Sequence, residues 1–176
     1  MNNELYQVPH VSTRLMLMED RTIYSTTQIN SPADIVKLMR EQLKTLDCEH
    51  CLVANVDVKN RPLNISTVSI GDLSGSIVPI RSVFKSAILS GASRIMLFHN
   101  HPSGDVTPSN EDMRITKRVI AAGQILGIHL IDHIIVGSDG DFFSFLQNVS
   151  DLFNGEQEAL SQDYLSDLLK DNTNTH

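Results

Sequence analysis

The chain has 176 residues, of which 41% are hydrophobic and 20% are charged, a composition typical of a soluble globular protein with one domain of ordinary size. Its formal net charge of −7 argues against a protein that mainly grips nucleic acid, because phosphate binding needs clustered lysine and arginine. The sequence shows no apolar run near the roughly 20 residues of a membrane span, no signal-peptide pattern and only two cysteines, so we expect a cytoplasmic protein.

Residues 1–30 are polar and weakly patterned, and we expect an N-terminal arm there with at most one short strand. The elements predicted after it, in chain order, are a helix at 31–46, strands at 49–58 and 63–70, a helix at 80–91, a strand at 94–99, a helix at 109–126 and a strand at 128–136. Ser31 and Pro32 mark the start of the first helix as N-cap and first helical residue. The order predicts one α/β (α+β) domain over residues 31–150, with a mixed sheet and flanking helices.

Two further expectations concern a helix face and the C-terminal tail. In the helix at 80–91, the residues expected to face inward are Val83, Phe84, Ala87 and Ile88. The tail at 151–176 is acidic, and a modest amphipathic helix is predicted there from Leu160, Tyr164 and Leu168. The tail is therefore expected to hold a short helix followed by a polar end.

Two histidines and an aspartate fall where a strand turns into a helix. His99 and His101 are two residues apart at a strand end, so both imidazoles can face one side while Asn100 faces the other. Asp112 lies in the first turn of the next helix, from which its carboxylate can return toward the strand end. Two imidazole nitrogens and one carboxylate oxygen, with a fourth position open to water, are typical of catalytic zinc. We therefore predict one Zn²⁺ per chain, held by His99, His101 and Asp112.

A simpler interpretation of the same residues stays open. Ser109 and Asp112 also fit a capping box, with Ser109 as the N-cap and Asp112 at the third helical position. Asp112 would then only satisfy helix amides, and the histidines would be polar residues at a strand end. A metal-activated water would also need a base, and Glu49, just before the first strand, is by itself an ordinary surface glutamate.

The string HNHPSGDVTPSNED at 99–112, with LGIHLIDHIIVG at 126–137 and a glutamate at the start of an earlier strand, resembles the JAMM (MPN/JAB) metalloprotease motif. It is similar more narrowly to the RadC family, often labelled a DNA repair family, over roughly residues 22–147. The resemblance implies a JAB/MPN, cytidine-deaminase-like architecture with zinc held by the two histidines and Asp112. It also implies that Glu49 takes the proton from zinc-bound water and that Ser109 supports the tetrahedral intermediate.

The function implied is that of a zinc-dependent hydrolase, a metallopeptidase or isopeptidase with a protein or peptide substrate. Two alternatives remain: a DNA repair or recombination accessory, and a catalytically idle zinc scaffold. RadC proteins commonly begin with a helix–hairpin–helix region, for which this chain has no room, so we expect nucleic-acid binding to be weak or absent. The family's usual basic–acidic pair reads Arg81-Ser82 here, which puts a local salt bridge in doubt and leaves the zinc site untouched.

Two other pairs are less informative. Cys48 and Cys51 are three residues apart in an extended segment and face opposite sides, so we do not expect them to share a metal. A zinc deaminase would need HxE with a distant PCxxC, and neither is present. Asp132 and His133 lie inside an apolar strand, where one must face the core, and a role in supporting a metal ligand stays open for them.

Overall fold

The computed structural model describes residues 16–18, 30–71 and 78–154. Its elements are α1 (Pro32–Leu43), β1 (His50–Val56), β2 (Pro62–Ile70), α2 (Ile80–Ser90), β3 (Arg94–His101), α3 (Asn110–Leu126), β4 (His129–Gly137), β5 (Phe142–Ser144), α4 (Phe145–Asn148) and α5 (Asp151–Asn154). The strands form a five-stranded sheet in the order β2-β1-β3-β4-β5. β3 and β4 run parallel and the other neighbours run antiparallel. The predicted mixed sheet with flanking helices is confirmed.

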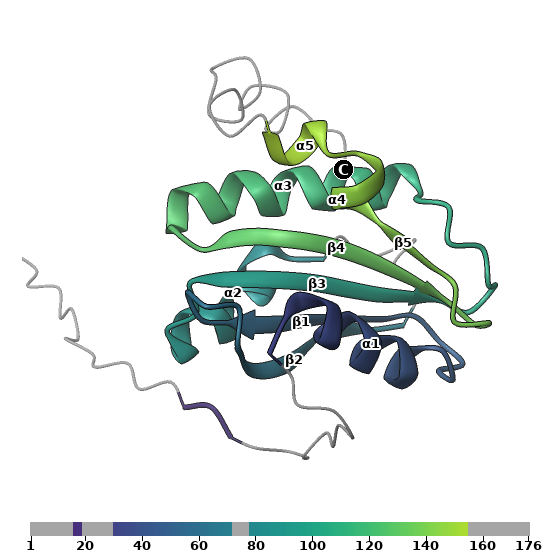
Figure 1. Ribbon diagram of the computed structural model, residues 1–176, viewed down its shortest axis with the longest axis horizontal. Helices are drawn as coiled ribbons and strands as arrows, with labels where there is room; N and C mark the ends of the chain where they lie inside the picture. Colours follow the sequence, from purple (N-terminus) through teal and green to yellow (C-terminus); the bar gives the residue numbers. More distant parts are fainter. Residues whose placement is uncertain (1–15, 19–29, 72–77, 155–176) are drawn as a thin grey trace, which may run out of the picture.

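Helices cover both faces of the sheet (Figure 1). On one face, α1 packs Ile35, Met39 and Leu43 against side chains of β1, β3 and β4. On the other face, α2 and α3 enclose a second core with the alternate residues of the same strands. The central strands β1, β3 and β4 are therefore buried on both sides, which explains their nearly continuous apolar sequences.

The middle strand of the sheet, β3, carries the two histidines at its C-terminal end. Ile95 and Leu97 belong to the core shared with α2 and α3, whereas Met96 and Phe98 belong to the core under α1. Alternation along the strand continues this pattern, so His99 and His101 face the α3 side. The sheet thus fixes which helix the histidines can meet.

The loop between β3 and α3 is held against the end of β4 by two glycines. Gly104 has a φ of 86°, in the left-handed region that favours glycine. The carbonyl oxygen of Gly104 would lie 2.6 Å from a Cβ placed on Gly137, so any side chain at position 137 would push the loop away. This close approach brings the start of α3 back to the end of β3.

The structure departs from the sequence prediction at several places. The predicted inward position of Ile88 is wrong, because this side chain is 57% exposed. Ser86 is buried in its place, and its Oγ accepts a hydrogen bond of 2.9 Å from the side-chain amide of Asn55. The first helix ends at Leu43, three residues before the predicted end. The strand β5 was not predicted, because three residues are too few to show a period.

Several predictions fall on residues that the structure does not describe. The N-terminal arm predicted over residues 1–30 lies outside the described residues, apart from 16–18 and 30. The amphipathic helix predicted from Leu160, Tyr164 and Leu168 also lies outside them. Within the described ranges, none of the helices has the length and apolar character needed to cross a membrane.

Candidate metal centre

Three side chains from two elements converge at the C-terminal end of β3. The Nε2 atoms of His99 and His101 are 2.9 Å apart. Asp112, in the first turn of α3, places Oδ1 3.1 Å from Nε2 of His99 and Oδ2 3.7 Å from Nε2 of His101. Within the described parts of the chain, no other group of three or more His, Cys, Asp or Glu residues lies close enough together to hold one metal ion. The structure therefore brings together the three residues named from the sequence.

The proton on His101 can be located from its neighbour. Its Nδ1 lies 2.6 Å from the backbone oxygen of Asp105, and a carbonyl oxygen can only accept a hydrogen bond. Nδ1 therefore carries the proton and donates it, which leaves the lone pair of Nε2 directed at His99 and Asp112. A neutral imidazole with a free Nε2 is the form that binds metal.

Asp112 serves as a helix cap and as a member of the cluster, with different oxygens. Its Oδ2 accepts hydrogen bonds from the backbone N–H and the hydroxyl of Ser109, at 2.7 and 2.6 Å. Its Oδ1 is directed at His99. The capping interpretation and the metal interpretation are therefore compatible, and the capping box orients the carboxylate toward the histidines.

The charge state of Asp112 suits a metal ligand. Burial works to raise the pKa of this carboxyl, but the nearby imidazole of His99 and the hydrogen bonds from Ser109 outweigh burial. The net effect holds the pKa of Asp112 well below its usual value. The group is therefore a carboxylate at neutral pH.

The donor set fits zinc. Two imidazole nitrogens and a carboxylate oxygen are usual zinc ligands, and two nitrogens each about 2.0 Å from one tetrahedral ion would be about 3.3 Å apart, close to the observed 2.9 Å. Three acceptor atoms at such short range repel one another unless a proton or a cation lies among them. The side chains of His99 and Asp112 are 1% and 6% exposed, whereas that of His101 is 15% exposed. The cluster thus reaches solvent on the His101 side.

Glu49 lies at the same end of the sheet. It directly precedes β1 and is half-buried, and its backbone oxygen accepts a hydrogen bond of 2.8 Å from the backbone of Gly71. The register of β1 against β3 pairs Cys51 with His99. If this register continued for two more residues, Glu49 would lie opposite His101, on the face that carries the cluster.

Asn100, between the two histidines, binds the backbone on both sides of Glu49. Its Oδ1 accepts a hydrogen bond of 2.7 Å from the backbone N–H of His50, and its Nδ2 donates one of 2.9 Å to the backbone oxygen of Cys48. Asn100 is 2% exposed, so these bonds lie inside the protein. This clamp could not be predicted from the sequence, because its partners lie about fifty positions away in the chain.

The pair Asp132 and His133 divides its contacts between two neighbours. His133 faces the core, with Nε2 2.8 Å from Nδ1 of His99. Asp132 instead accepts hydrogen bonds from the hydroxyl of Ser144 and the backbone N–H of Leu146, at 2.6 and 2.9 Å. Burial raises the pKa of the Asp132 carboxyl. Only His133 of this pair touches a member of the cluster.

A family model described as RadC-like JAB domain matches residues 29–150. The chain belongs to this family. The expectation drawn from the HxH and DHIIVG segments is therefore confirmed at the level of the family.

Several curated relatives carry the designation UPF0758 protein. That of Caldanaerobacter subterraneus subsp. tengcongensis is 50% identical over 124 residues, which cover 70% of this chain and 52% of the relative. That of Desulfitobacterium hafniense (strain DSM 10664 / DCB-2) is 49% identical over 111 residues, covering 63% and 49%. That of Bacillus cereus (strain G9842) is 42% identical over 135 residues, covering 77% and 59%. The chain thus spans about half the length of the curated relatives it matches.

The two cysteines of this RadC-like JAB domain are free thiols in different surroundings. Cys51 is buried in the core under α2 and α3, where burial, with a smaller contribution from the charge of Asp112, raises the pKa of its thiol to about 12. Cys48 is half-buried, and its sulfur lies 3.7 Å from Nδ1 of His50. A thiol with so high a pKa stays protonated at neutral pH and is a poor metal ligand.

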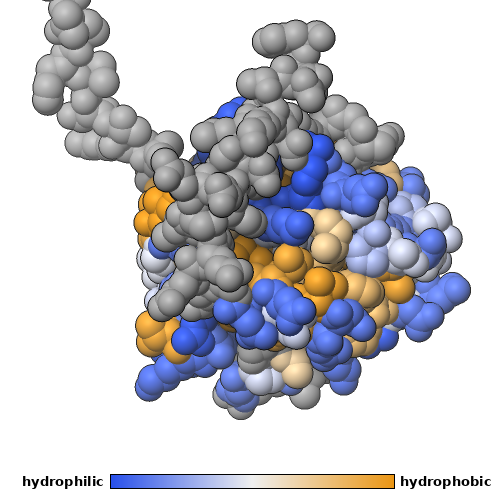
Figure 2. Space-filling view, turned by 90° about the horizontal axis from the view of Figure 1, so that it is seen from above, coloured by the Kyte–Doolittle hydropathy of each residue, from blue (hydrophilic) through white to orange (hydrophobic). Residues whose placement is uncertain are grey.

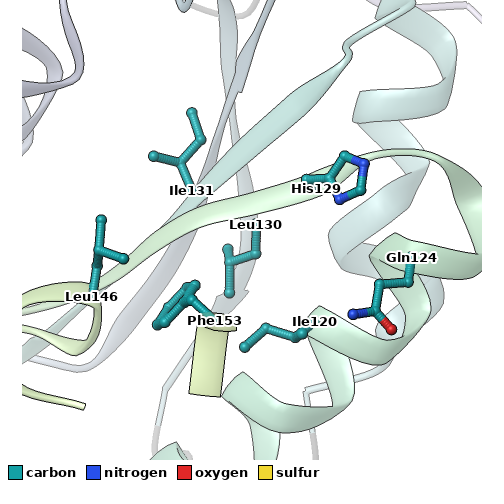
Figure 3. A pocket seen from close by; sticks show the side chains of 7 residues that line it. All are labelled: Ile120, Gln124, His129, Leu130, Ile131, Leu146 and Phe153. Carbon is teal, nitrogen blue, oxygen red and sulfur yellow. The ribbon is translucent and has the colours of Figure 1, made fainter. Parts of the chain in front are cut away.

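A separate hollow of the RadC-like JAB domain lies away from the cluster (Figure 3). It has a volume of about 190 Å³, and Ile120, Leu130 and Phe153 point toward one another around it (Figure 3). Leu130 pairs with Ile95 near the beginning of β3, whereas the cluster stands at the other end of that strand. The side of the molecule that carries α3 and α5 also displays apolar residues framed by hydrophilic ones (Figure 2). None of the three clustered side chains lines the hollow.

Proposed function

We propose that this RadC-like JAB domain is a zinc-dependent hydrolase of peptide or isopeptide bonds, with one zinc held by His99, His101 and Asp112. The observation that carries the proposal is the convergence of three acceptor atoms on one point, buried except on the His101 side. When bound, zinc supplies a Lewis acid that polarises a carbonyl group and makes water a nucleophile near neutral pH. The similarity to the JAMM motif supports peptide or isopeptide bonds as the class of substrate.

In this proposal Glu49 is the general base. Its carboxylate accepts a proton from the attacking water and passes the proton to the leaving amine. Two observations support the assignment: the β1–β3 register, which points to His101, and the clamp that Asn100 forms on the neighbouring peptide groups. A base held in this way loses little conformational entropy when it takes up its position in the reaction.

Ser109 has two proposed tasks, one in the resting protein and one during the reaction. At rest its hydroxyl donates to Oδ2 of Asp112, which orients the carboxylate. A hydroxyl has a single proton, so Ser109 must release Asp112 before it can donate to a developing oxyanion. We propose that this exchange accompanies substrate binding.

The test is zinc-dependent cleavage by the full-length chain. Zinc-loaded protein is incubated with one library of linear peptides and one of peptides joined through a lysine side chain, and new termini are identified by mass spectrometry. We expect cleavage in at least one library, lost in His99→Ala and about a hundredfold to ten-thousandfold slower in Glu49→Gln. The matched control is Glu41→Gln, a carboxylate on α1 that is paired with Lys44 and 61% exposed. It should cleave at the normal rate.

Two results would overturn the proposal. Cleavage of neither library by zinc-loaded protein would remove the hydrolase assignment. Cleavage by Glu49→Gln at the rate of Glu41→Gln would remove Glu49 as the base while leaving the metal centre intact.

A further inference from the structure

A chain of hydrogen bonds connects His99 to Asp112 through two residues outside the cluster. Nδ1 of His99 lies 2.8 Å from Nε2 of His133. Nδ1 of His133 lies 2.7 Å from the hydroxyl of Thr116 on α3. That hydroxyl lies 2.6 Å from the backbone oxygen of Asp112, one turn earlier in the same helix. The four residues therefore close a ring between β3, β4 and α3.

The direction of every proton in this ring follows from its last member. The backbone oxygen of Asp112 can only accept, so the hydroxyl of Thr116 donates its single proton there. The Thr116 oxygen must then accept from His133, which places a proton on Nδ1 of that ring. A neutral His133 has no second proton, so its Nε2 accepts from Nδ1 of His99.

The surroundings of His133 favour its neutral form, because burial away from water disfavours a charged imidazole. It and Thr116 are 1% and 0% exposed, and the ring of Phe145 stacks on that of His133 at 4.8 Å with an interplanar angle of 6°. The side chain of Asp132 holds Phe145 in place, because it accepts hydrogen bonds from Ser144 and Leu146, the residues on either side of Phe145.

We propose that Thr116 and His133 are positioning residues that fix the tautomer of His99, so that its Nε2 always faces the metal position. This inference rests on the proposed zinc centre. If His133 carried its proton on Nε2, it would donate to Nδ1 of His99, and His99 would then need its own proton on Nε2. That tautomer cannot bind a metal through Nε2. The Thr116 hydroxyl excludes it.

The first test is the zinc affinity of the full-length chain, measured by competition with a chromogenic chelator. Thr116→Val keeps the shape of the side chain and removes the hydroxyl, whereas Thr116→Ser keeps the hydroxyl. Losing a residue that orients a metal ligand typically costs about 10- to 100-fold in affinity, so we expect that loss in Thr116→Val and near-normal affinity in Thr116→Ser. His133→Leu should lose affinity similarly, and His133→Gln, which can still accept from His99, should recover part of it.

The matched control is Ser86→Ala. Ser86 is 3% exposed and hydrogen-bonds Asn55, which pairs with Ile95 near the beginning of β3. The variant removes a buried hydroxyl of the same face of the sheet, away from the cluster. We expect it to lower the stability of the fold and to leave the zinc affinity unchanged, which separates the loss of a ligand support from the loss of a buried hydrogen bond.

The second test is spectroscopic. Nitrogen-15 NMR of the imidazole rings distinguishes the two neutral tautomers without any substrate. In zinc-loaded protein we expect His133 with its proton on Nδ1, and in Thr116→Val a mixture that includes the Nε2–H form. The tautomer of His133 would be the same in both proteins if Thr116 only packed against its neighbours.

The outcomes separate the two proposals. If the unaltered protein binds no zinc, the proposed function fails. If it binds zinc, but Thr116→Val and His133→Leu bind it equally tightly, only the positioning inference fails. An Nε2–H tautomer of His133 in the zinc-loaded protein would also overturn the inference by itself. Because Thr116→Val changes little in volume, the test holds even if His133→Leu does not fold.

Discussion

The helices α1 and α3 begin with the same device, yet only α3 takes part in the metal cluster. Ser31 and Asp34 form a capping box at the start of α1, as Ser109 and Asp112 do at the start of α3. The serine hydroxyl donates to the carboxylate at 2.7 Å in the first box and at 2.6 Å in the second. As helix caps, the two boxes are nearly identical.

The difference lies in what faces the second carboxylate oxygen. Asp34 is half-buried, and its described hydrogen bonds come from Asn30 and Ser31. Asp112 is buried, with Oδ1 3.1 Å from a buried histidine of β3. A local motif is therefore enough to start a helix, but the chemistry depends on which strand lies opposite the cap.

The largest effect expected from this comparison is on zinc content. Asp112→Asn replaces the anionic ligand with a neutral amide, and we expect the purified protein to fall from about one zinc per chain to near none. Asp34→Asn makes the same change in the other box and should retain the metal. Elemental analysis of both proteins checks this, and equal zinc in the two variants would mean that Asp112 only caps α3.

The next largest effect is expected from removing the side chain of Asn100, which bonds the backbone of Cys48 and His50 on both sides of Glu49. The capping box of α1 has no such support. Asn100→Ala leaves the backbone N–H of His50 and the backbone oxygen of Cys48 without their partner, which should cost about 2 kcal/mol of unfolding free energy. Zinc should be retained, since Asn100 faces away from the cluster, while hydrolysis slows because Glu49 is less well held. Urea unfolding, zinc analysis and the cleavage assay measure the three quantities. Unchanged cleavage would contradict the clamp.

A third prediction concerns acid sensitivity of the metal-free protein. His133 has a folded pKa well below its ordinary value of 6.5, so the unfolded chain binds a proton more readily in this range. Stability should therefore fall as the pH drops below about 6.5, by up to about 1.4 kcal/mol per pH unit from this group. After burial, the groups that act on the pKa of His133 are His99 and His101, which lower it, and Asp112, which raises it.

The variant His133→Gln isolates this contribution. Urea unfolding of the metal-free proteins between about pH 7 and pH 5 should show a shallower pH dependence in the variant than in the unaltered chain. Asp34 cannot mimic the effect, because a carboxyl whose pKa is lowered changes stability only below about pH 4. Identical slopes in the two proteins would show that His133 is protonated in the folded state.

The smallest effect is expected from removing the serine hydroxyl of each capping box. Ser31→Ala and Ser109→Ala each remove a side-chain cap and should cost about 1 kcal/mol of unfolding free energy. Only Ser109→Ala should also weaken zinc binding, by about tenfold, because Asp112 loses the bonds that orient it. A loss of zinc affinity in both variants, or in neither, would contradict the role given to Ser109.

The sequence was sufficient for the cluster because its members are set by local rules. Strand alternation places His99 and His101 on one side, and the capping box places Asp112 in the first turn of α3. The residues that support the cluster depend on contacts between distant elements. Nothing in the local sequence marks Thr116, because its contact with His133 depends on how α3 packs on β4. The contacts of Asn100 likewise depend on the pairing of β1 with β3.

The errors have the same origin. Ile88 fits an inward helical position by periodicity, but Ser86 is the residue that turns toward the sheet, where Asn55 supplies its partner. The short strand β5 is defined by its pairing with β4 and by the hydroxyl of Ser144 on Asp132. Neither contact leaves a periodic signal in the sequence.

X-ray absorption at the zinc edge of the zinc-loaded protein distinguishes the proposed ligands, two imidazoles and one carboxylate, from cysteine sulfur. We expect nitrogen and oxygen neighbours at about 2.0–2.2 Å from the zinc, with outer scattering from two imidazole rings. Sulfur at about 2.3 Å would contradict it, because the metal would then be bound by Cys48 or Cys51 instead of the cluster of His99, His101 and Asp112.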